Sequence, residues 1–367
     1  MISPAIQAKV KNGERISRSE GIRLLRDAEL LDLAEMANLV RFRNNPRPRV
    51  TFVVDTNPNY TNICENDCTF CAFYRRRGDK DAYSATVSEM IINFQAAAAK
   101  GVTTILLQGG VNAELPFDYF LEMVKKTIAE VPAVHPHFYS APEIMGMSRL
   151  SGLSIHEVLQ QLWDAGLRTL PGGGAEVLSD RVKKKISPRK GSTADWLAVM
   201  REAHRIGFKS TATMMYGHLE REQDILAHLE SIRNLQDEYG GFTAFVPWSF
   251  KPDNSPLGKI IPQRATPTRY LRIIALARIF LDNFPHIQSS WFSEGKKIGQ
   301  LALYFGADDF GGTLLEENVH AAANYLNQTN VNECITMIHA AGFDAAERNT
   351  CYEIRKVFLK TNPNRQS

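Results

Sequence analysis

The chain has 367 residues, of which 44% are hydrophobic and 23% are charged, the balance of a folded globular protein rather than a disordered one. Its formal net charge is only +3, so nothing in the composition suggests nucleic acid or an anionic membrane as a partner. No apolar stretch approaches the ~20 residues that a membrane-spanning helix needs, and the N-terminal segment lacks the apolar core of a secretory signal.

Residues 1–48 are predicted to form a helical extension. Ser17 and Glu20 have the spacing of a capping box, which marks the start of a helix. Apolar residues then recur near a helical period up to Met36. The segment Asn44–Pro48 interrupts this pattern, so we expect the extension to end there.

From residue 49 to about 315, short β-rich runs alternate with amphipathic helical stretches. Eight runs are predicted as strands: Val50–Asp55, Thr103–Gln108, His137–Ser140, Leu167–Leu170, Lys209–Met214, Thr243–Pro247, Ile287–Trp291 and Leu301–Phe305. Helices are predicted near 86–99, 117–130, 154–165, 193–206, 222–238, 267–283 and 295–300. This alternation predicts a parallel (β/α)8 barrel of the TIM type. A doubly wound open sheet is the alternative, and it ranks lower because no glycine fingerprint follows the first strand. Residues 316–367 are predicted to be a helical tail packed on the barrel.

Three of the five cysteines crowd into one segment directly after the first predicted strand. Cys64, Cys68 and Cys71 have the spacing C-x3-C-x2-C, which does not suggest a disulfide framework, so we expect a reducing cytoplasm. Three thiolates are one fewer than the four that close an electron-transfer cluster, and a structural zinc site also takes four ligands. The motif therefore favours an iron–sulfur cluster with one iron open to a substrate or cofactor. Cys334 and Cys351 lie far away in the chain and are not expected to be ligands.

Two other classes of protein remain possible on these residues. A non-catalytic iron–sulfur electron carrier or sensor would hold a cluster without binding a cofactor on it. A zinc-dependent barrel hydrolase would use the cysteines differently. The open iron at the predicted mouth of a barrel, where such folds place their chemistry, argues against both.

The cysteine motif at the end of the first strand resembles the radical S-adenosylmethionine (SAM) superfamily. The segments TNICENDCTFCAFYR, LPGGGAEVLSDRV, TATMMYGHLE, GFTAFVPWSFKP and GADDFGGTLLEENV are similar to its menaquinone and deazaflavin branch. The resemblance implies that Cys64, Cys68 and Cys71 hold a [4Fe–4S] cluster. It also implies that SAM chelates the fourth iron and is cleaved to a 5′-deoxyadenosyl radical, with an electron from a donor such as flavodoxin or ferredoxin.

The segments after the fifth and sixth strands narrow the resemblance. They are most similar to members that act in the futalosine route to menaquinone and close a ring from ribose C4′ onto a benzoate ring. Aminofutalosine synthases and deazaflavin synthases share the cysteine motif and much of the barrel, and they remain alternatives. The resemblance to the ring-closing members implies a small nucleoside-derived substrate.

Several residues beyond the cysteines are predicted to bind the cofactor. Glycines let a ligand approach the backbone closely, and a carboxylate can accept ribose hydroxyls. On these grounds, and on the resemblance, the predicted SAM contacts follow strands one to four: Phe70, Gln108, Gly109, Gly110, Ser140, Glu143, Glu176 and Arg181.

Residues after the later strands are predicted to bind and transform the substrate. Aromatic side chains at a barrel mouth can stack on an aromatic substrate and exclude water. The predicted substrate contacts are Tyr216, Trp248, Lys251, Trp291 and Asp309. Lys251 or Arg181 is expected to pair with the benzoate. His218 or Glu220 is expected to remove the final ring proton, since both carry a titratable group just past strand five.

Overall fold

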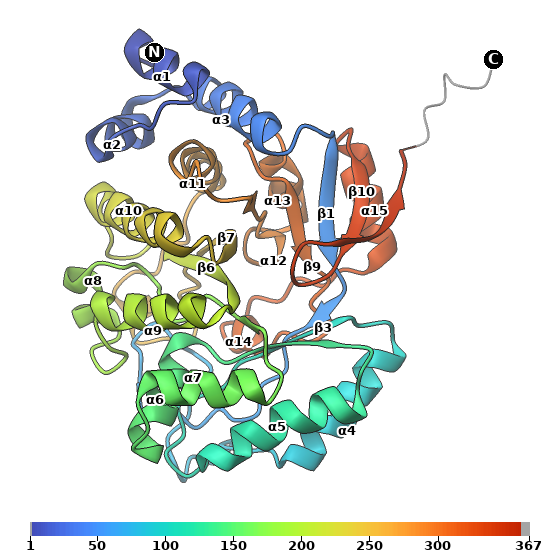
Figure 1. Ribbon diagram of the computed structural model, residues 1–367. Helices are drawn as coiled ribbons and strands as arrows, with labels where there is room; N and C mark the ends of the chain where they lie inside the picture. The colour runs from blue at the N-terminus through green and yellow to red at the C-terminus, as the bar shows by residue number, and fades with distance from the viewer. Residues whose placement is uncertain (1, 361–367) are drawn as a thin grey trace.

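The computed structural model describes residues 2–360 and shows a ring of parallel strands wrapped by helices (Figure 1). One sheet has seven strands in the order β2-β3-β4-β5-β6-β7-β8, and a second has four in the order β11-β10-β1-β9. β1 and β2 follow each other in one extended run, and a parallel bridge between Gln288 and Asp309 joins β8 to β9. The two sheets therefore form one closed wall, and the predicted (β/α)8 fold is confirmed.

Each of the first seven predicted strands overlaps an observed one, although the predicted Ile287–Trp291 shares only Ile287 with β8 and Trp291 begins α12. Their bounds are β1 (Arg49–Val53), β2 (Asp55–Thr56), β3 (Thr104–Leu107), β4 (His135–Phe138), β5 (Thr169–Leu170), β6 (Lys209–Tyr216), β7 (Phe242–Ser249), β8 (His286–Ile287), β9 (Asp309–Gly312), β10 (Asp344–Arg348) and β11 (Ile354–Phe358).

The helices cover the outside of the barrel and its N-terminal end. Their bounds are α1 (Pro4–Asn12), α2 (Arg18–Asp27), α3 (Leu30–Asn44), α4 (Val87–Ala99), α5 (Phe117–Glu130), α6 (Ala141–Ser151), α7 (Ile155–Asp164), α8 (Asp180–Ile186), α9 (Thr193–Ile206), α10 (Glu222–Tyr239), α11 (Pro267–Phe280), α12 (Trp291–Glu294), α13 (Lys296–Ala302), α14 (Asn318–Ala322) and α15 (Val331–Ala340), with a 3-10 turn at Leu257–Lys259. No helix within residues 2–360 combines the length and apolar character needed to cross a bilayer.

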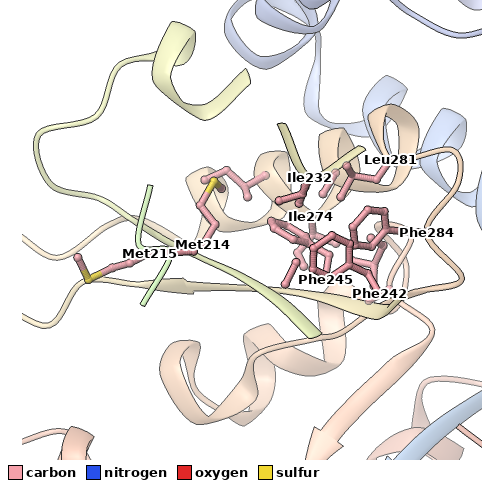
Figure 2. Close-up of a cluster of buried hydrophobic side chains, with 14 of the residues drawn as sticks. Met214, Met215, Ile232, Phe242, Phe245, Ile274, Leu281 and Phe284 are labelled. Atoms are coloured by element: carbon pink, nitrogen blue, oxygen red, sulfur yellow. The ribbon is translucent and has the colours of Figure 1, made fainter. Parts of the chain in front are cut away.

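Apolar side chains on the outer face of the strands form the core between sheet and helices. Phe242 and Phe245 of β7 pack there with Ile232 of α10 and Ile274 of α11 (Figure 2). The ring of Phe242 stacks on that of Phe284, with 5.3 Å between centroids. Because fully burying such a side chain contributes roughly 1.5–3 kcal/mol, this layer holds the helices onto the barrel and leaves the inner face of the strands available for polar groups.

The N-terminal extension behaves as its sequence pattern predicts. Ser17 accepts a hydrogen bond from the Glu20 backbone N–H while the Glu20 side chain accepts one from the Ser17 N–H, so the capping box is present. The third helix ends at Asn44, where the predicted break begins. This helix packs against α11, which ties the extension to the barrel (Figure 1).

The prediction of the eighth strand at Leu301–Phe305 is wrong. Leu301 and Ala302 end α13, and the residues that follow form a turn. Ala302, Leu303 and Phe305 are buried while Leu301 and Tyr304 are exposed, so the apolar run covers one side of a helix end and its turn. The true eighth strand is the glycine-containing β9, which has weak strand propensity and is held by parallel pairing with β1.

The prediction that the C-terminal tail is helical is only partly correct, because the tail also contains two strands. After α14 and α15, β10 pairs in parallel with β1, and β11 pairs antiparallel with β10. Ala345 and Ala346 of β10 are completely buried, so tertiary pairing overrides the helical propensity of alanine. Residues 361–367 of the predicted tail lie outside the described residues.

Candidate active site

A cavity of about 340 Å³ opens at the carboxyl ends of the strands and extends into the barrel lumen. Its wall at the mouth includes the cysteine loop and the loops after β3, β4 and β5. Glu317 and His320, which follow β9, also lie at the mouth. Deeper in the lumen the wall is made by inward-facing strand residues and by residues in and after β10: Asp55, Thr104, His137, Thr211, Thr213, Gln288, Arg348, Thr350 and Tyr352. In β3, Thr104 and Leu106 face the lumen while Ile105 and Leu107 pack under the helices, which is the two-residue alternation of a strand.

Cys64, Cys68 and Cys71 all line this cavity, as the spacing predicts. The Val111 N–H points at the Cys64 sulfur at 3.4 Å, and the Cys71 N–H donates to the Cys68 carbonyl at 3.1 Å. Burial raises the pKa of Cys68 to about 12.

No fourth thiol joins the cysteine loop within residues 2–360. Cys334 is buried in α15, and Cys351 lies in an exposed turn after β10. In the same described part of the chain, no three or more His, Cys, Asp or Glu side chains gather closely enough to hold a single metal ion. Each iron of a cubane takes one thiolate, so a cluster does not require such convergence. Three soft sulfur donors around one cavity, with an open side, are the donor set that a [4Fe–4S] cluster with one free iron requires.

Gly109 and Gly110, which line the cavity, let the cysteine loop lie directly on the end of β3. A Cβ on Gly110 would stand 2.1 Å from the Ile63 carbonyl oxygen, and one on Gly109 would stand 2.6 Å from the Tyr60 ring. Both are far inside van der Waals contact, so neither position accepts a side chain. The predicted close approach of backbone is present, and here the approaching group is the cysteine loop itself.

Glu143 and Ser140 also line the cavity, but the Glu143 carboxylate is occupied by the chain. One oxygen accepts from the Tyr60 hydroxyl (2.7 Å) and the Gly109 N–H (3.0 Å). The other accepts from the backbone N–H (2.7 Å) and the hydroxyl of Ser140. Glu143 therefore fastens α6 to the loop after β3, while Ser140 caps that helix.

Glu176 lies in the cavity wall, with its carboxylate enclosed by the chain. Its Oε1 accepts from Lys190 Nζ at 2.7 Å, whereas its Oε2 is buried without a partner within residues 2–360. The backbone of Glu176 has φ +43°, a left-handed conformation that costs energy for a side-chain-bearing residue. Lys190, which the sequence analysis missed, also lies 5.3 Å from the centre of the Phe70 ring. Phe70, Gln108 and Glu176 all line the cavity, as predicted.

The structure places the other predicted residues behind the cavity wall. Arg181 pairs with Asp224, and Asp309 pairs with Arg348. Trp291 donates to the Gly312 carbonyl (3.1 Å), and Lys251 donates to the Ser249 hydroxyl (2.6 Å). Tyr216, the last residue of β6, is fully buried and stacks on Tyr270. Of the predicted substrate contacts, Trp248 is the one that lines the cavity.

The two predicted proton-transfer residues also lie outside the cavity. Glu220 accepts from the backbone N–H groups of Gly217 (2.7 Å) and His218 (2.8 Å). The His218 Nε2 lies 3.0 Å from the Met215 carbonyl, and burial lowers the pKa of this imidazole. Both side chains close the turn after β6, so this geometry does not favour the predicted role, which stays untested.

Sequence reasoning missed the wall opposite the cysteines. His320 of α14 lies with its ring centre 5.2 Å from that of Phe292 and 5.7 Å from that of Trp248. Glu317 binds Asn57 (2.6 Å) beside it. A lone histidine some 250 residues from the cysteine motif carries no spacing signal, so only the fold relates the two.

Comparison with known proteins agrees with this geometry. Residues 58–232 match the radical SAM superfamily, and residues 239–361 match the CofH/MqnC C-terminal region. The chain therefore belongs to the radical SAM superfamily, whose members use a [4Fe–4S] cluster and SAM, and within it to the CofH/MqnC group.

Relatives with three different names are about equally similar to this chain. A cyclic dehypoxanthine futalosine synthase of Halalkalibacterium halodurans is 37% identical over 96% of this chain and 95% of its own length. An aminodeoxyfutalosine synthase of Thermus thermophilus is 38% identical over 95% of both chains. A 5-amino-6-(D-ribitylamino)uracil–L-tyrosine 4-hydroxyphenyl transferase of Methanoculleus marisnigri is 40% identical over 93% of this chain and 95% of its own.

Among solved structures, methylornithine synthase has the same fold. It superposes with a TM-score of 0.73 at 17% identity, covering 92% of this chain and 96% of the other. At that identity, the likeness shows the fold alone.

Proposed function

We propose that this protein is a radical SAM cyclase that converts dehypoxanthine futalosine into cyclic dehypoxanthine futalosine by joining ribose C4′ to the benzoate ring. The observation that carries the proposal is a single cavity that reaches from three thiols to an aromatic wall made by Trp248, Phe292 and His320. The full-length match to the Halalkalibacterium halodurans synthase supports the choice of substrate. So does the resemblance of the segments around β6 and β7.

Cys64, Cys68 and Cys71 would hold the cluster, since they are the three soft donors of the cavity. When bound, the cluster and SAM together supply a 5′-deoxyadenosyl radical that takes hydrogen from ribose C4′. The protein contributes binding, orientation and exclusion of water.

Glu176 and Lys190 are suited to hold the amino acid end of SAM. The Oε2 of Glu176 is an unused acceptor that can bind an ammonium group, while Lys190 is a buried cation that already pairs with Glu176 Oε1. Gln108 and the backbone next to Gly109 lie on the same side of the cavity.

The remaining wall is suited to the substrate. Trp248 and Phe292 offer flat apolar surfaces for the benzoate ring, and the lumen offers hydroxyls from Thr211 and Thr213 for a polar end. Holding the ribose carbon near the ring makes ring closure a unimolecular step, and an enclosed cavity keeps water from the radical.

The test is anaerobic turnover of the reconstituted enzyme with SAM and a reductant. We expect 5′-deoxyadenosine and the cyclised product in equal amounts from dehypoxanthine futalosine, measured by mass spectrometry. Turnover of the enolpyruvyl benzoate substrate, or of a ribitylaminouracil with tyrosine, would instead assign one of the sister activities. A cluster signal without 5′-deoxyadenosine from any of them would indicate an electron carrier.

We also propose that an acidic one-electron carrier, a flavodoxin or ferredoxin, docks beside the cysteine loop. A second hollow there is lined by Cys64 and by four arginines against three carboxylates: Arg76, Arg77, Arg149, Arg189, Glu65, Asp67 and Glu114. The side chains of Arg77 and Arg189 are 81% and 67% exposed, and their ion pairs with Glu114 and Asp67 lie at the surface, where a partner can compete for them.

Charge reversal tests this docking site. The double substitution Arg77→Glu with Arg189→Glu should raise the KM for flavodoxin about tenfold and leave dithionite-driven turnover unchanged. Arg201→Glu, on the outer face of α9, is the matched control. Equal loss with both reductants would argue against docking here.

A further inference from the structure

His320 is a buried polar side chain that the chain itself leaves unused. It is 7% exposed, it lines the cavity, and its Nδ1 is fully enclosed. The enclosed Nδ1 has no hydrogen-bond partner within residues 2–360, although buried polar groups in folded proteins usually have one. Because Nδ1 is enclosed by the chain and Nε2 is not, Nε2 is the ring nitrogen that a ligand in the cavity can meet.

The surroundings of His320 define what that ligand looks like. The Phe292 ring lies nearly parallel to the imidazole, at 24°, with 5.2 Å between centres. Trp248 lies at 5.7 Å, and both aromatic rings line the cavity. The flat aromatic ring of a ligand can lie against the apolar faces of Phe292 and Trp248. A polar substituent on that ring would then be within reach of the His320 imidazole.

His320 is held in place and kept neutral. Glu317 accepts the backbone N–H groups of Val319 (2.9 Å) and His320 (3.0 Å), which pins the start of α14. Burial, with the nearby charge of Lys251, lowers the pKa of His320 to about 3. A neutral imidazole donates one hydrogen bond and accepts one, so it can serve an anionic oxygen without carrying a charge of its own.

We propose that Trp248, Phe292 and His320 form the subsite for the substrate's aromatic ring, and that His320 donates a hydrogen bond to the carboxylate on that ring. The inference deepens the proposed function and rests on it for the identity of the whole substrate. The chemistry of the subsite, an aryl carboxylate, can be tested without any turnover.

The test is a double-mutant cycle between residue and ligand on the reconstituted holoenzyme with SAM. The probes are 3-acetylbenzoate and acetophenone, which differ by the carboxylate, and their dissociation constants are measured by ligand-observed NMR titration. His320→Phe keeps the flat ring and removes the donor. We expect it to weaken 3-acetylbenzoate about 10- to 100-fold, as loss of a hydrogen bond to a charged group does, and acetophenone less than about twofold.

Two further variants make the cycle decisive. His320→Asn retains an N–H donor and should recover most of the binding of 3-acetylbenzoate that the phenylalanine variant loses. His156→Phe changes a half-exposed histidine of α7, paired with Glu202 far from the cavity, and should bind both probes normally. Unfolding temperature and iron content establish that each variant is intact.

The outcomes separate this inference from the proposed function. Equal weakening of both probes, or of neither, would overturn the role of His320, and so would an asparagine variant as poor as the phenylalanine one. If His320→Phe does not fold, the asparagine variant decides alone: a loss of tenfold or more would overturn the proposal. If His320→Phe weakens only 3-acetylbenzoate while dehypoxanthine futalosine is not turned over, the role of His320 in the subsite is supported and the proposed substrate is wrong.

Discussion

Two regions of the barrel differ in the hydrogen bonding of their buried polar groups. We call them the floor, around Asp309 and Arg348, and the mouth, around Glu176 and His320. At the floor, the Asp309 carboxylate pairs with Arg348 and accepts from the Thr51 hydroxyl (2.6 Å), so every charge meets a partner from the chain. At the mouth, Glu176 Oε2 and His320 Nδ1 have none within residues 2–360. Both regions are almost inaccessible to solvent. Burial alone therefore does not distinguish structural from ligand-binding residues here.

The largest effect is expected from a substitution in the cysteine loop at the mouth. Cys68→Ala should remove cluster binding and reduce turnover to background, because three thiolates are the whole protein share of the cluster. Iron and sulfide analysis together with the visible spectrum would show it. The control is Cys351→Ala, in an exposed turn, which should keep full iron content. Normal iron in the Cys68 variant would refute the assignment of the site.

At the floor, Asp309→Asn should destabilise the fold strongly. It leaves the buried Arg348 guanidinium without a counter-charge, and breaking a buried pair in this way costs about 3–5 kcal/mol. Chemical denaturation would measure the loss in the free energy of unfolding. Glu238→Gln, which breaks the exposed pair with Arg201, should cost less than about 1 kcal/mol. Similar losses in the two variants would mean that the floor pair is no more structural than a surface one.

Asp55 lies between floor and mouth and should make stability depend on pH. Burial raises its pKa from 3.8 to about 7, against the opposing Leu314 N–H and Arg348 and with the help of Asp309 and Glu317. The folded state therefore binds more protons than the unfolded state between pH 4 and 7, and stability falls as pH rises through that range. Asp55→Asn should remove this slope, a difference of a few kcal/mol between pH 4 and pH 8. Parallel pH profiles for the two proteins would show that the Asp55 carboxyl titrates normally.

The smallest expected effect is at the mouth. Glu176→Gln should weaken SAM about tenfold, because its one amide oxygen keeps the contact with Lys190 and an NH2 group, which cannot accept a hydrogen bond, replaces the unused carboxylate oxygen. Equilibrium dialysis with SAM would measure it. Glu202→Gln on α9 is the control and should bind SAM normally. If the Glu176 variant bound SAM normally but were less stable, Glu176 would have a structural role, as Glu143 has, and not a role in binding SAM.

Local patterns in the sequence determined the cysteine motif, the capping box at Ser17, the first seven strands and most of the helices. Each of these depends on residues within a few positions of one another, where propensity and periodicity act. The tertiary structure alone decided that the glycine-containing β9 closes the barrel and that β10 joins the wall beside β1. It also decided that His320 lines the same cavity as the cysteines, while His218, Arg181 and Asp309 do not line it. The reason is physical: those outcomes depend on which distant groups pack together and find partners, and neither packing nor hydrogen bonding between segments hundreds of residues apart leaves a local pattern in the chain.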